Sequence, residues 1–514
     1  MKTKFESAAL FIMAALLTLT SAAKAGDQPE IRTPKPPATP HINGPAIFGV
    51  RPSSPFLYRI PATGQRPMQF SIDGLPQGLA VDQAIGQITG SLKDVGEHVV
   101  ILRAKNSLGS AEKKFKIVVG ETLALTPPMG WNSWNCWGSK VSAEKVLASA
   151  RGMASSGLID HGWTYINIDD AWQSDKRDGP FHAIQGNSMF PDMKGLCDEI
   201  HNLGLKAGIY STPWVTSYAN HMGGSAENPE GTWEKPAIPK KGNVNKKILP
   251  WAIGKYSFAE NDAKQWAAWG IDYLKYDWNP NELPETQEMY KALRASGRDV
   301  VLSLSNSTPF KNISELSKIA NCWRITGDIR DNWDSMSKKG FGQDKWAPYS
   351  GPGHWNDPDM LVVGYVGWGS PHPTNLTPDE QYTHISIWCL ASAPLLLGCD
   401  LTKLDEFTIN LLSNDEVLDV NQDSLGKQAV RISNEADLQV YAKDLADGSK
   451  AVGLFNLGNQ PATVAAKWPD LKISGPQAVR DLWRQKDLGQ FDDQFQITVA
   501  PHGAELICIM PKAK

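Results

Sequence analysis

Apolar and polar positions follow a short period at both ends of the chain and a longer one in its centre. From about residue 46 to 120, short alternating stretches such as residues 70–72 and 115–119 are separated by glycine and proline, which predicts a small antiparallel β-sandwich. Alternation returns over residues 426–514, for example at 438–442 and 505–509, and predicts a C-terminal antiparallel β-sandwich domain. Neither segment suggests chemistry, so we expect structural roles for both.

Residues 121–425 alternate apolar runs with stretches of helical spacing. The expected strands are residues 129–134, 165–169, 205–210, 273–276, 300–304, 322–326, 354–356 and 394–397. Residues 143–155, 193–203 and 285–295 carry apolar side chains at the spacing of amphipathic helices. Eight such units predict an α/β fold, a (β/α)8 TIM barrel. A doubly wound sheet is the alternative, but no glycine-rich phosphate loop follows the first strand.

Acidic and aromatic side chains stand at the ends of these apolar runs or follow them closely. They are Trp134, Asp169, Asp170, Tyr210, Asp277, Asp328 and Asp359. A barrel places its functional side chains at the carboxyl ends of its strands. Because the pattern recurs on different strands, it predicts an active site at that end of the barrel.

The N-terminus has the pattern of a secretory signal. Lys2 and Lys4 precede an apolar run at residues 8–20, and Ala23-Lys24-Ala25 fits a small-residue cleavage site. Residues 1–25 are therefore predicted to be a signal peptide and the protein to be exported, to the periplasm or the medium. Residues 26–45 are rich in proline and predict an extended linker.

Composition and the absence of certain motifs argue against several classes of binding partner. The net charge of −4 gives no sign of a nucleic-acid or membrane-surface partner, and no later stretch of the mature chain has a membrane-spanning pattern. The six cysteines form no CxxC pair, and the chain has no HExxH motif or calcium-loop spacing. We expect no metal and no cofactor. The sequence leaves open which cysteines pair and whether the chain forms a homo-oligomer.

Two acids lie among aromatic and basic neighbours. Asp277 follows Lys275, and Asp328 follows Arg324. Cleavage of a glycosidic bond needs one carboxylate as a nucleophile and one carboxylic acid to protonate the leaving oxygen. Nearby tryptophans offer flat apolar faces for a sugar ring. Each acid could instead be a buried structural aspartate, and a carbohydrate-binding protein without activity is the alternative from another class.

These motifs resemble glycoside hydrolase family 27, the α-galactosidase and α-N-acetylgalactosaminidase family. The resemblance covers roughly residues 122–514 and rests on motifs that occur in family order. They are residues 129–134 (MGWNSW), 168–172 (IDDAW), 275–277 (KYD), 323–328 (WRITGD) and 355–360 (WNDPDM). The N-terminal segment lies outside it, and its residues 74–79 and 104–109 resemble the immunoglobulin-like modules of bacterial secreted enzymes.

The family resemblance implies a retaining enzyme that acts on an oligosaccharide or small molecule with terminal α-galactose. It implies that Asp277 is the nucleophile and Asp328 the acid/base, with their carboxyl groups about 5–5.5 Å apart. It also implies a set of substrate-binding residues: Trp134, Asp169, Asp170, Tyr210, Lys275, Ser305, Arg324, Asp359 and Met360. Asp331 is the alternative acid, on which Asp328 would instead be a structural partner of Arg330.

Electrostatics is compatible with those roles. Lys275, two residues before Asp277 on the same strand face, favours the ionised nucleophile. The negative charge of Asp277 is expected to raise the pKa of Asp328 until the covalent intermediate neutralises it.

Two departures from the family pattern concern the pocket. Many members carry a cysteine just after the nucleophile, whereas Trp278 follows it here, and we expect Trp214 and Trp278 to build this wall instead. The loop after the fifth strand reads the sugar's 2-position, and here it carries Ser305 rather than a glutamate. An α-N-acetylgalactosaminidase or a β-L-arabinopyranosidase of the same fold therefore remains an alternative activity.

Overall fold

The computed structural model describes residues 29–233 and 251–510. The predicted signal peptide at residues 1–25 lies outside the described residues. None of the helices in the described part combines the length and the hydropathy that a bilayer crossing requires.

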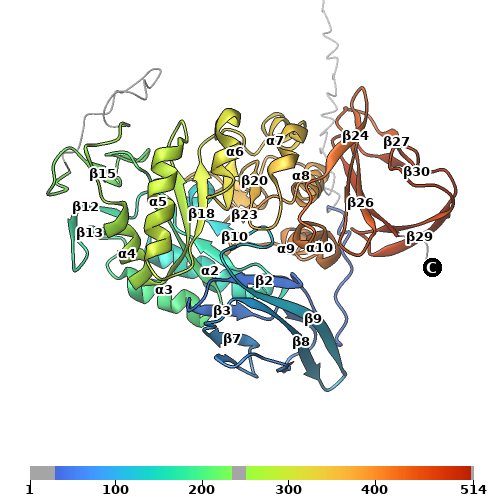
Figure 1. Cartoon of the computed structure of the whole chain (residues 1–514). Coiled ribbons are helices and arrows are strands. Elements are labelled where there is room, and N and C mark those ends of the chain that lie inside the picture. Colours follow the sequence, from blue (N-terminus) through green and yellow to red (C-terminus); the bar gives the residue numbers. More distant parts are fainter. Residues whose placement is uncertain (1–28, 234–250, 511–514) are drawn as a thin grey trace, which may run out of the picture. The chain divides into compact units, whose positions relative to one another are not determined.

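The centre of the chain is a barrel of eight parallel strands (Figure 1). In chain order they are β10 (Met129–Asn132), β11 (Tyr165–Asn167), β14 (Lys206–Ser211), β17 (Ile271–Asp277), β18 (Val301–Ser305), β19 (Cys322–Arg324), β20 (Trp355–Asp357) and β23 (Leu395–Leu397). Consecutive strands are neighbours, and β23 returns to β10. The backbone N–H of Leu361, just after β20, donates to the carbonyl of Leu396 at 2.8 Å, which closes the ring. The (β/α)8 prediction is confirmed, because a doubly wound sheet would stay open.

The strands occur where the apolar runs predicted them, with shifted ends. The first expected strand continued to Trp134, but β10 ends at Asn132 and helix α1 (Trp134–Trp137) begins two residues later. The strand before the expected nucleophile is longer than predicted and includes Asp277 itself. Short strands with buried side chains carry no alternation to mark their ends, which explains these shifts.

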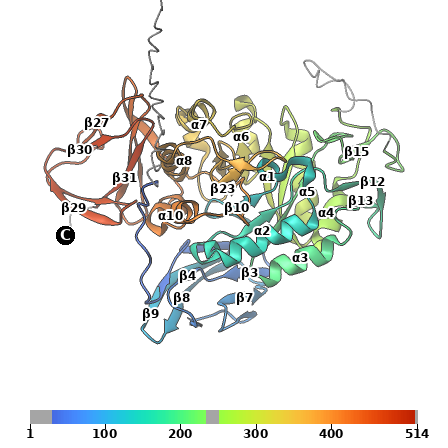
Figure 2. The same cartoon turned by 180° about the vertical axis from the view of Figure 1, so that it is seen from behind.

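Helices cover the outside of the barrel (Figures 1 and 2). They include α2 (Ala143–Ser155), α3 (Met193–Asn202), α4 (Ala259–Trp269), α5 (Leu283–Ala295), α6 (Ile313–Leu316), α7 (Trp333–Gly340), α8 (Pro378–Leu390), α9 (Glu406–Leu412) and α10 (Asp415–Gln422). Local signals set their ends. The Ser142 hydroxyl accepts from the N–H of Lys145 at the start of α2, Thr377 and Glu380 form a capping box on α8, and Gly270 ends α4 at a φ of 95°.

The N-terminal region is a two-sheet sandwich with its own core. One sheet holds β2 (Ile47–Val50), β5 (Gln69–Asp73), β8 (Gly96–Asn106) and β9 (Gly109–Val119), and the other β3 (Phe56–Arg59), β6 (Leu79–Val81) and β7 (Gln87–Gly90). The expectation of a purely antiparallel sandwich is wrong at one place, because β2 pairs with β9 in parallel. A connection through the second sheet separates β2 from β9 in the chain, so a parallel pairing is geometrically available.

Charged and polar contacts join this sandwich to the barrel. The Nε of Arg51 lies 2.6 Å from Asp299 Oδ1, next to the start of β18, and Arg59 donates to the carbonyl of Leu203 at 3.1 Å. The expected linker is not loose throughout. Thr33 is buried, and its N–H and carbonyl bond the side chain of Asn410 at 3.1 and 2.8 Å.

The C-terminal domain is antiparallel, as predicted. Its larger sheet holds β24 (Val430–Glu435), β25 (Leu438–Asp444), β26 (Lys450–Asn456), β28 (Gln477–Asp481), β29 (Lys486–Phe491) and β31 (Ala504–Met510). A second pair, β27 (Ala462–Lys467) with β30 (Gln494–Val499), shares a hydrophobic core with it. Helix α8 packs between this sheet and the barrel, where Tyr382 meets Trp483 edge to face.

Candidate active site

The predicted site residues gather at one rim of the barrel. Because all eight strands are parallel, their carboxyl ends lie at the same end of the ring. Tyr210, Lys275, Asp277, Ser305 and Arg324 lie within the last residues of their strands, and the others lie in loops or a helix that directly follow strand ends. These others are Trp134, Asp169, Asp170, Asp328, Asp359 and Met360.

Asp277 lies beside a buried ion pair. The ammonium of Lys275 lies 2.8 Å from Asp169 Oδ2, and Asp169 is buried to 2% exposure. Lys275 and Asp277 are two residues apart on β17, so both side chains project to the same face. The charge of Lys275 therefore acts on two carboxylates, one that it contacts directly and one beside it.

Arg324 organises the opposite side of the site. Its guanidinium lies 2.8 Å from Asp359 Oδ2 and 3.3 Å from Asp328 Oδ1. Asp359 is buried and also accepts from the N–H of Ile329 at 2.7 Å, whereas the Asp328 side chain is 60% exposed. One acid is thus held inside the wall, and the other faces the solvent from which a substrate would arrive.

Asp170 anchors a loop. Its Oδ1 accepts from the hydroxyl of Ser217 at 2.8 Å, and its Oδ2 accepts from the N–H of Ala219 at 2.8 Å. Gln173 also donates to Oδ1, at 3.1 Å. The sequence prediction gave Asp170 a role in substrate binding. The structure shows that its carboxylate is largely engaged in fixing the loop after β14.

Four of the predicted site residues each have a buried polar atom without a hydrogen-bond partner among the described residues. These atoms are the hydroxyl of Tyr210, Oδ1 of Asp277, Nε of Arg324 and Oδ1 of Asp359. Buried polar atoms without a partner are rare in folded proteins because each costs about 1–3 kcal/mol. Four of them on four barrel elements mark a place where a polar ligand would complete the hydrogen bonding.

The two candidate carboxylates differ in protonation. Burial raises the pKa of Asp277 to about 7, against the opposing effect of Lys275, and the charges of Asp169 and Asp328 add to the rise. For Asp328, burial also acts to raise the pKa, but Arg324 and Lys275 outweigh it, so the pKa is lowered. The expectation that the charge of Asp277 raises the pKa of Asp328 is therefore wrong for the ligand-free site. The exposed Asp328 carboxylate lies against Arg324, a partner whose strength the sequence did not show.

Ser305 lies next to the candidate nucleophile. In the register of β17 and β18, Asp277 and Ser305 are direct partners, and Ser305 is 2% exposed. It lines a small internal cavity of about 20 Å³ together with Lys275, Arg324 and Met360, among others. The residue is thus inside the site rather than in a solvated loop.

The sequence missed Tyr218, which follows β14. Its ring lies 5.1 Å from that of Trp214, and its side chain is partly exposed. Burial raises the pKa of its phenol, and the charges of both Asp277 and Asp328 raise it further, so this hydroxyl stays a proton donor beside the acids. The rule that loops after barrel strands build the site could have pointed to it.

The expected role of Trp278 in the pocket wall is wrong. Trp278 is 1% exposed, and its ring packs on Tyr276 at 4.9 Å, two residues away on the same face. That face is the opposite one from Asp277, because side chains alternate along a strand. Trp214 does lie beside the site, through its contact with Tyr218.

Asp331, the alternative acid, is engaged elsewhere. It is buried, and its Oδ2 accepts from the N–H and the side-chain amide of Asn375 at 3.0 and 2.9 Å. Its contacts are those of a structural residue.

All six cysteines are free thiols, five of them buried. The described residues include no group of three or more His, Cys, Asp or Glu that could hold a metal ion.

Comparison with known proteins gives consistent matches. The family model described as alpha galactosidase A matches residues 126–228 and 242–423, and the model of the alpha galactosidase C-terminal beta sandwich domain matches residues 435–509. Alpha-galactosidase 2 of Arabidopsis thaliana is 38% identical over 398 residues, which cover 76% of this chain and 91% of that protein.

Solved structures agree in fold. A Bacteroides fragilis protein of known structure superimposes with a TM-score of 0.81 and 33% identity, covering 93% of this chain and 98% of that one. A β-L-arabinopyranosidase of Geobacillus stearothermophilus gives a TM-score of 0.64 and 30% identity, covering 76% of this chain and 97% of that one. The chain therefore belongs to the alpha galactosidase A family, within glycoside hydrolase family 27.

Proposed function

We propose that the protein is a retaining, exo-acting α-galactosidase that removes terminal α-linked galactose from oligosaccharides or glycoconjugates. The family membership supports a glycosidase, and the named relative from Arabidopsis thaliana is an alpha-galactosidase. The geometry adds two carboxylates that act on each other electrostatically at the functional rim of the barrel.

The four unpartnered polar atoms carry this proposal. A pyranose presents several hydroxyl groups around its ring, each of which both donates and accepts. The carboxylate oxygens of Asp277 and Asp359 would accept from such hydroxyls, and Nε of Arg324 would donate to one. A site with these partners selects hydroxyl-bearing ligands, because a ligand without matching hydroxyls would leave the atoms unpaired.

In the proposed first step, Asp277 attacks the anomeric carbon of galactose while Asp328 gives its proton to the leaving oxygen. A covalent galactosyl-enzyme forms and the aglycone departs. In the second step, Asp328 takes a proton from water, which attacks the anomeric carbon and releases galactose and Asp277. Two inversions at one carbon leave the product in the α-configuration.

Substrate binding would rearrange the proton that the pair shares. In the free site, Asp277 has the raised pKa and the exposed Asp328 the lowered one. A bound sugar displaces water from Asp328 and places hydroxyls on Asp277, which favours the proton on Asp328 and the charge on Asp277. Before the first step the two acids share one proton, so we treat them as a coupled pair.

The main activity is tested by a panel of nitrophenyl glycosides. The α-galactoside should give the highest kcat/KM, above the α-N-acetylgalactosaminide and the β-L-arabinopyranoside. Proton NMR of the first product should show the α-anomer. Turnover of none of the three sugars would contradict the enzyme, and an initial β-anomer would contradict the retaining mechanism.

A second candidate activity, α-N-acetylgalactosaminidase, has one observation in its favour. Ser305, directly beside Asp277, is short and leaves space at the expected 2-position of the sugar. A Ser305→Glu variant should lower kcat/KM for the N-acetyl substrate by about tenfold or more relative to the galactoside, because the longer acid fills that space and can bond a 2-hydroxyl. Ser307→Glu, two residues further along the chain, is the control. An unchanged ratio would remove Ser305 from the recognition of the 2-position.

We also propose that the protein is exported and that its N-terminal sandwich is an immunoglobulin-like module. The basic start, the apolar run and the cleavage site support export. The two-sheet architecture of residues 46–120 supports the module. Sequencing of the mature N-terminus checks the first proposal, and a start before Gly26 that retains the apolar run would contradict it.

A further inference from the structure

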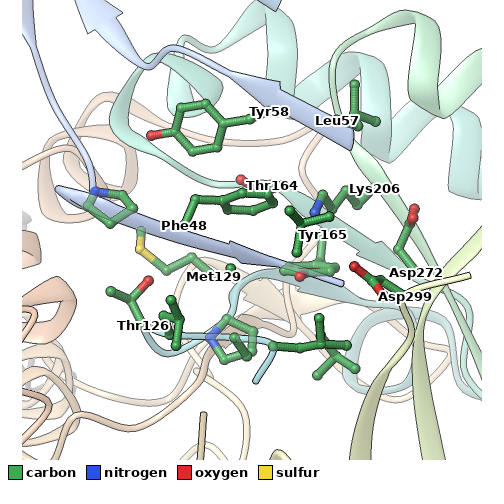
Figure 3. Close-up of a pocket in the computed structure, with 18 of the residues that line it drawn as sticks. Phe48, Leu57, Tyr58, Thr126, Met129, Thr164, Tyr165, Lys206, Asp272 and Asp299 are labelled. Atoms are coloured by element: carbon green, nitrogen blue, oxygen red, sulfur yellow. The ribbon is translucent and has the colours of Figure 1, made fainter. Parts of the chain in front are cut away.

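A second cavity lies at the opposite end of the barrel, between the N-terminal sandwich and the amino-terminal ends of the strands (Figure 3). Its volume is about 100 Å³. Phe48, Leu57 and Tyr58 line it from the sandwich, and Met129 and Tyr165 line it from the barrel. Concave spaces at domain interfaces, lined mainly by apolar side chains with a few polar groups, are typical of small-molecule sites.

Lys206, the first residue of β14, directs its ammonium into this space. The nitrogen lies 4.6 Å from the centre of the Phe48 ring and 5.8 Å from that of Tyr165. No described residue forms a hydrogen bond or an ion pair with it. Aromatic faces attract a cation, but they do not neutralise its charge.

The other charged groups of the lining are already paired. Asp272 accepts from Arg298 at 2.6 Å and lies 2.8 Å from His201 Nε2, and Asp299 is paired with Arg51. Arg59 lies 3.8 Å from Asp160 Oδ1 and also donates to the carbonyl of Leu203. Among the described residues, Lys206 is therefore the cation of this cavity that has no counter-charge in contact.

Tyr58 adds a second polar group without a partner. Its hydroxyl is buried and forms no hydrogen bond with any described residue. Burial also raises the pKa of the phenol, so the group is a neutral donor. A buried donor of this kind costs free energy unless something accepts from it.

We propose that this cavity binds a small organic monoanion with a flat apolar body, such as an aromatic carboxylate. The anion would pair with the ammonium of Lys206, and the apolar body would lie among Phe48, Leu57 and Met129. The site is separate from the proposed active site and does not depend on the reaction catalysed there.

Size and polarity together favour this class of ligand. An enclosed apolar cavity of about 150 Å³ accommodates benzene. This space is smaller, about 100 Å³, but it is partly open, so one ring is the largest apolar body that it takes and part of the ligand would lie outside the walls. A simple inorganic anion would pair with Lys206 but would leave the apolar side chains of the cavity in contact with water. A neutral hydrocarbon would fill the space but would leave Lys206 unpaired.

Calorimetry on the mature protein tests the proposal with benzoate and its neutral isostere benzamide. One benzoate should bind per chain, and benzamide about tenfold more weakly, because it lacks the charge that Lys206 pairs with. Lys206→Met should weaken benzoate by about tenfold and leave benzamide nearly unchanged. Tyr58→Phe should weaken benzoate by a few-fold at most. Lys105→Met, which removes an exposed lysine of the same sandwich, should change neither.

Several outcomes would overturn the proposal. Benzoate that shows no saturable binding, or that binds Lys206→Met as tightly as the wild type, would do so. If Lys206→Met does not fold, as judged by circular dichroism, the crystal structure of the wild type with benzoate decides. A carboxylate within hydrogen-bonding distance of Lys206 Nζ supports the site, and benzoate absent from the cavity refutes it.

Discussion

Two partly buried lysines on adjacent barrel strands have opposite surroundings. Lys275, near the carboxyl end of β17, lies 2.8 Å from Asp169, while Lys206, at the amino end of β14, faces aromatic rings. Burial acts to lower the pKa of both. For Lys275, Asp169 and Asp277 outweigh burial and raise the pKa, whereas for Lys206 burial prevails and the pKa is lowered. The contrast teaches that contacting carboxylates, rather than depth, decide how firmly a buried lysine keeps its charge.

The two ends of the barrel therefore carry two different kinds of site. At the carboxyl end, Lys275 and Arg324 each contact a carboxylate, and we propose that Asp277 and Asp328 exchange a proton during the reaction. At the amino end, Lys206 contacts no carboxylate among the described residues, and we propose that a ligand supplies one.

The largest expected effect comes from neutralising one carboxylate at each end of β17. Asp277→Asn should lower kcat for an α-galactoside by about 10⁴-fold or more, since it removes the proposed nucleophile. Asp272→Asn should leave kcat within a few-fold, because Asp272 contacts Arg298, His201 and the N–H of Ala207 instead. Steady-state kinetics on purified, folded variants measures both.

Either of two results would break this part of the comparison. Near-normal turnover by folded Asp277→Asn would remove the nucleophile assignment. A loss of kcat in Asp272→Asn as large as that in Asp277→Asn would mean that the two ends of the strand do not act separately.

The next effect concerns Asp328, the exposed acid beside Arg324. Asp328→Ala should lower kcat/KM by about 10²–10⁴-fold for substrates with poor leaving groups and much less for a dinitrophenyl galactoside, which needs no protonation. Azide should restore the second step and yield the α-galactosyl azide, because it attacks the β-linked galactosyl-enzyme with inversion. Asp331→Ala is the matched control and should show neither the leaving-group dependence nor the azide product. Equal losses on all leaving groups without rescue would argue against Asp328.

The lysines themselves should respond differently to removal of their charge. Lys275→Met leaves Asp169 buried without its cation, so the free energy of unfolding should fall by about 3–5 kcal/mol. Lys206→Met removes a charge that has no contacting carboxylate and should change the free energy of unfolding by less than about 1 kcal/mol. Urea unfolding followed by tryptophan fluorescence measures both. Equal losses would show that Lys206 has a structural partner after all.

The barrel could be predicted from the sequence because eight apolar runs of strand length are spaced along residues 121–425. All eight became strands. Three helices were predicted from their periodicity, and α8 was among those that were not, because its residues are buried on nearly every side and no polar stripe marks a period. The parallel pairing of β2 with β9 also escaped prediction, since alternation reports the buried face of a strand and not its partner.

The sequence predicted which residues gather at the site better than it predicted what each of them contacts. Strand ends and motif order brought Asp277, Asp328 and Arg324 to one rim. Which of the two acids has the higher pKa depends on the distance between Arg324 and Asp328 and on the exposure of Asp328 to water. The spacing of residues in the sequence does not determine either. The engagement of Asp170 and the position of Tyr218 depend on the loop after β14, whose conformation follows from tertiary contacts.

The remaining prediction is a stability change that depends on pH. The folded pKa of Asp277 is about 7, above the value of about 3.9 expected in the unfolded chain. The unfolded state therefore binds fewer protons between these values, and the wild type loses stability as pH rises through this window. Asp277→Asn should be as stable as the wild type near about pH 4 and more stable at about pH 8, by up to about 4 kcal/mol.

Asp272, on the same strand, should give the opposite pH dependence of the free energy of unfolding. Burial raises its pKa, but the hydrogen bond with His201 and the charge of Arg298 prevail, so its folded pKa is lowered. Its ionised form contributes stability above the unfolded pKa, and that contribution is lost as pH falls through the folded value. Asp272→Asn should thus be less stable than the wild type at about pH 8, with the gap closing in acid. Urea unfolding at both pH values decides: two variants that shift in the same direction would show that the two ends of β17 do not differ in how they hold a buried acid.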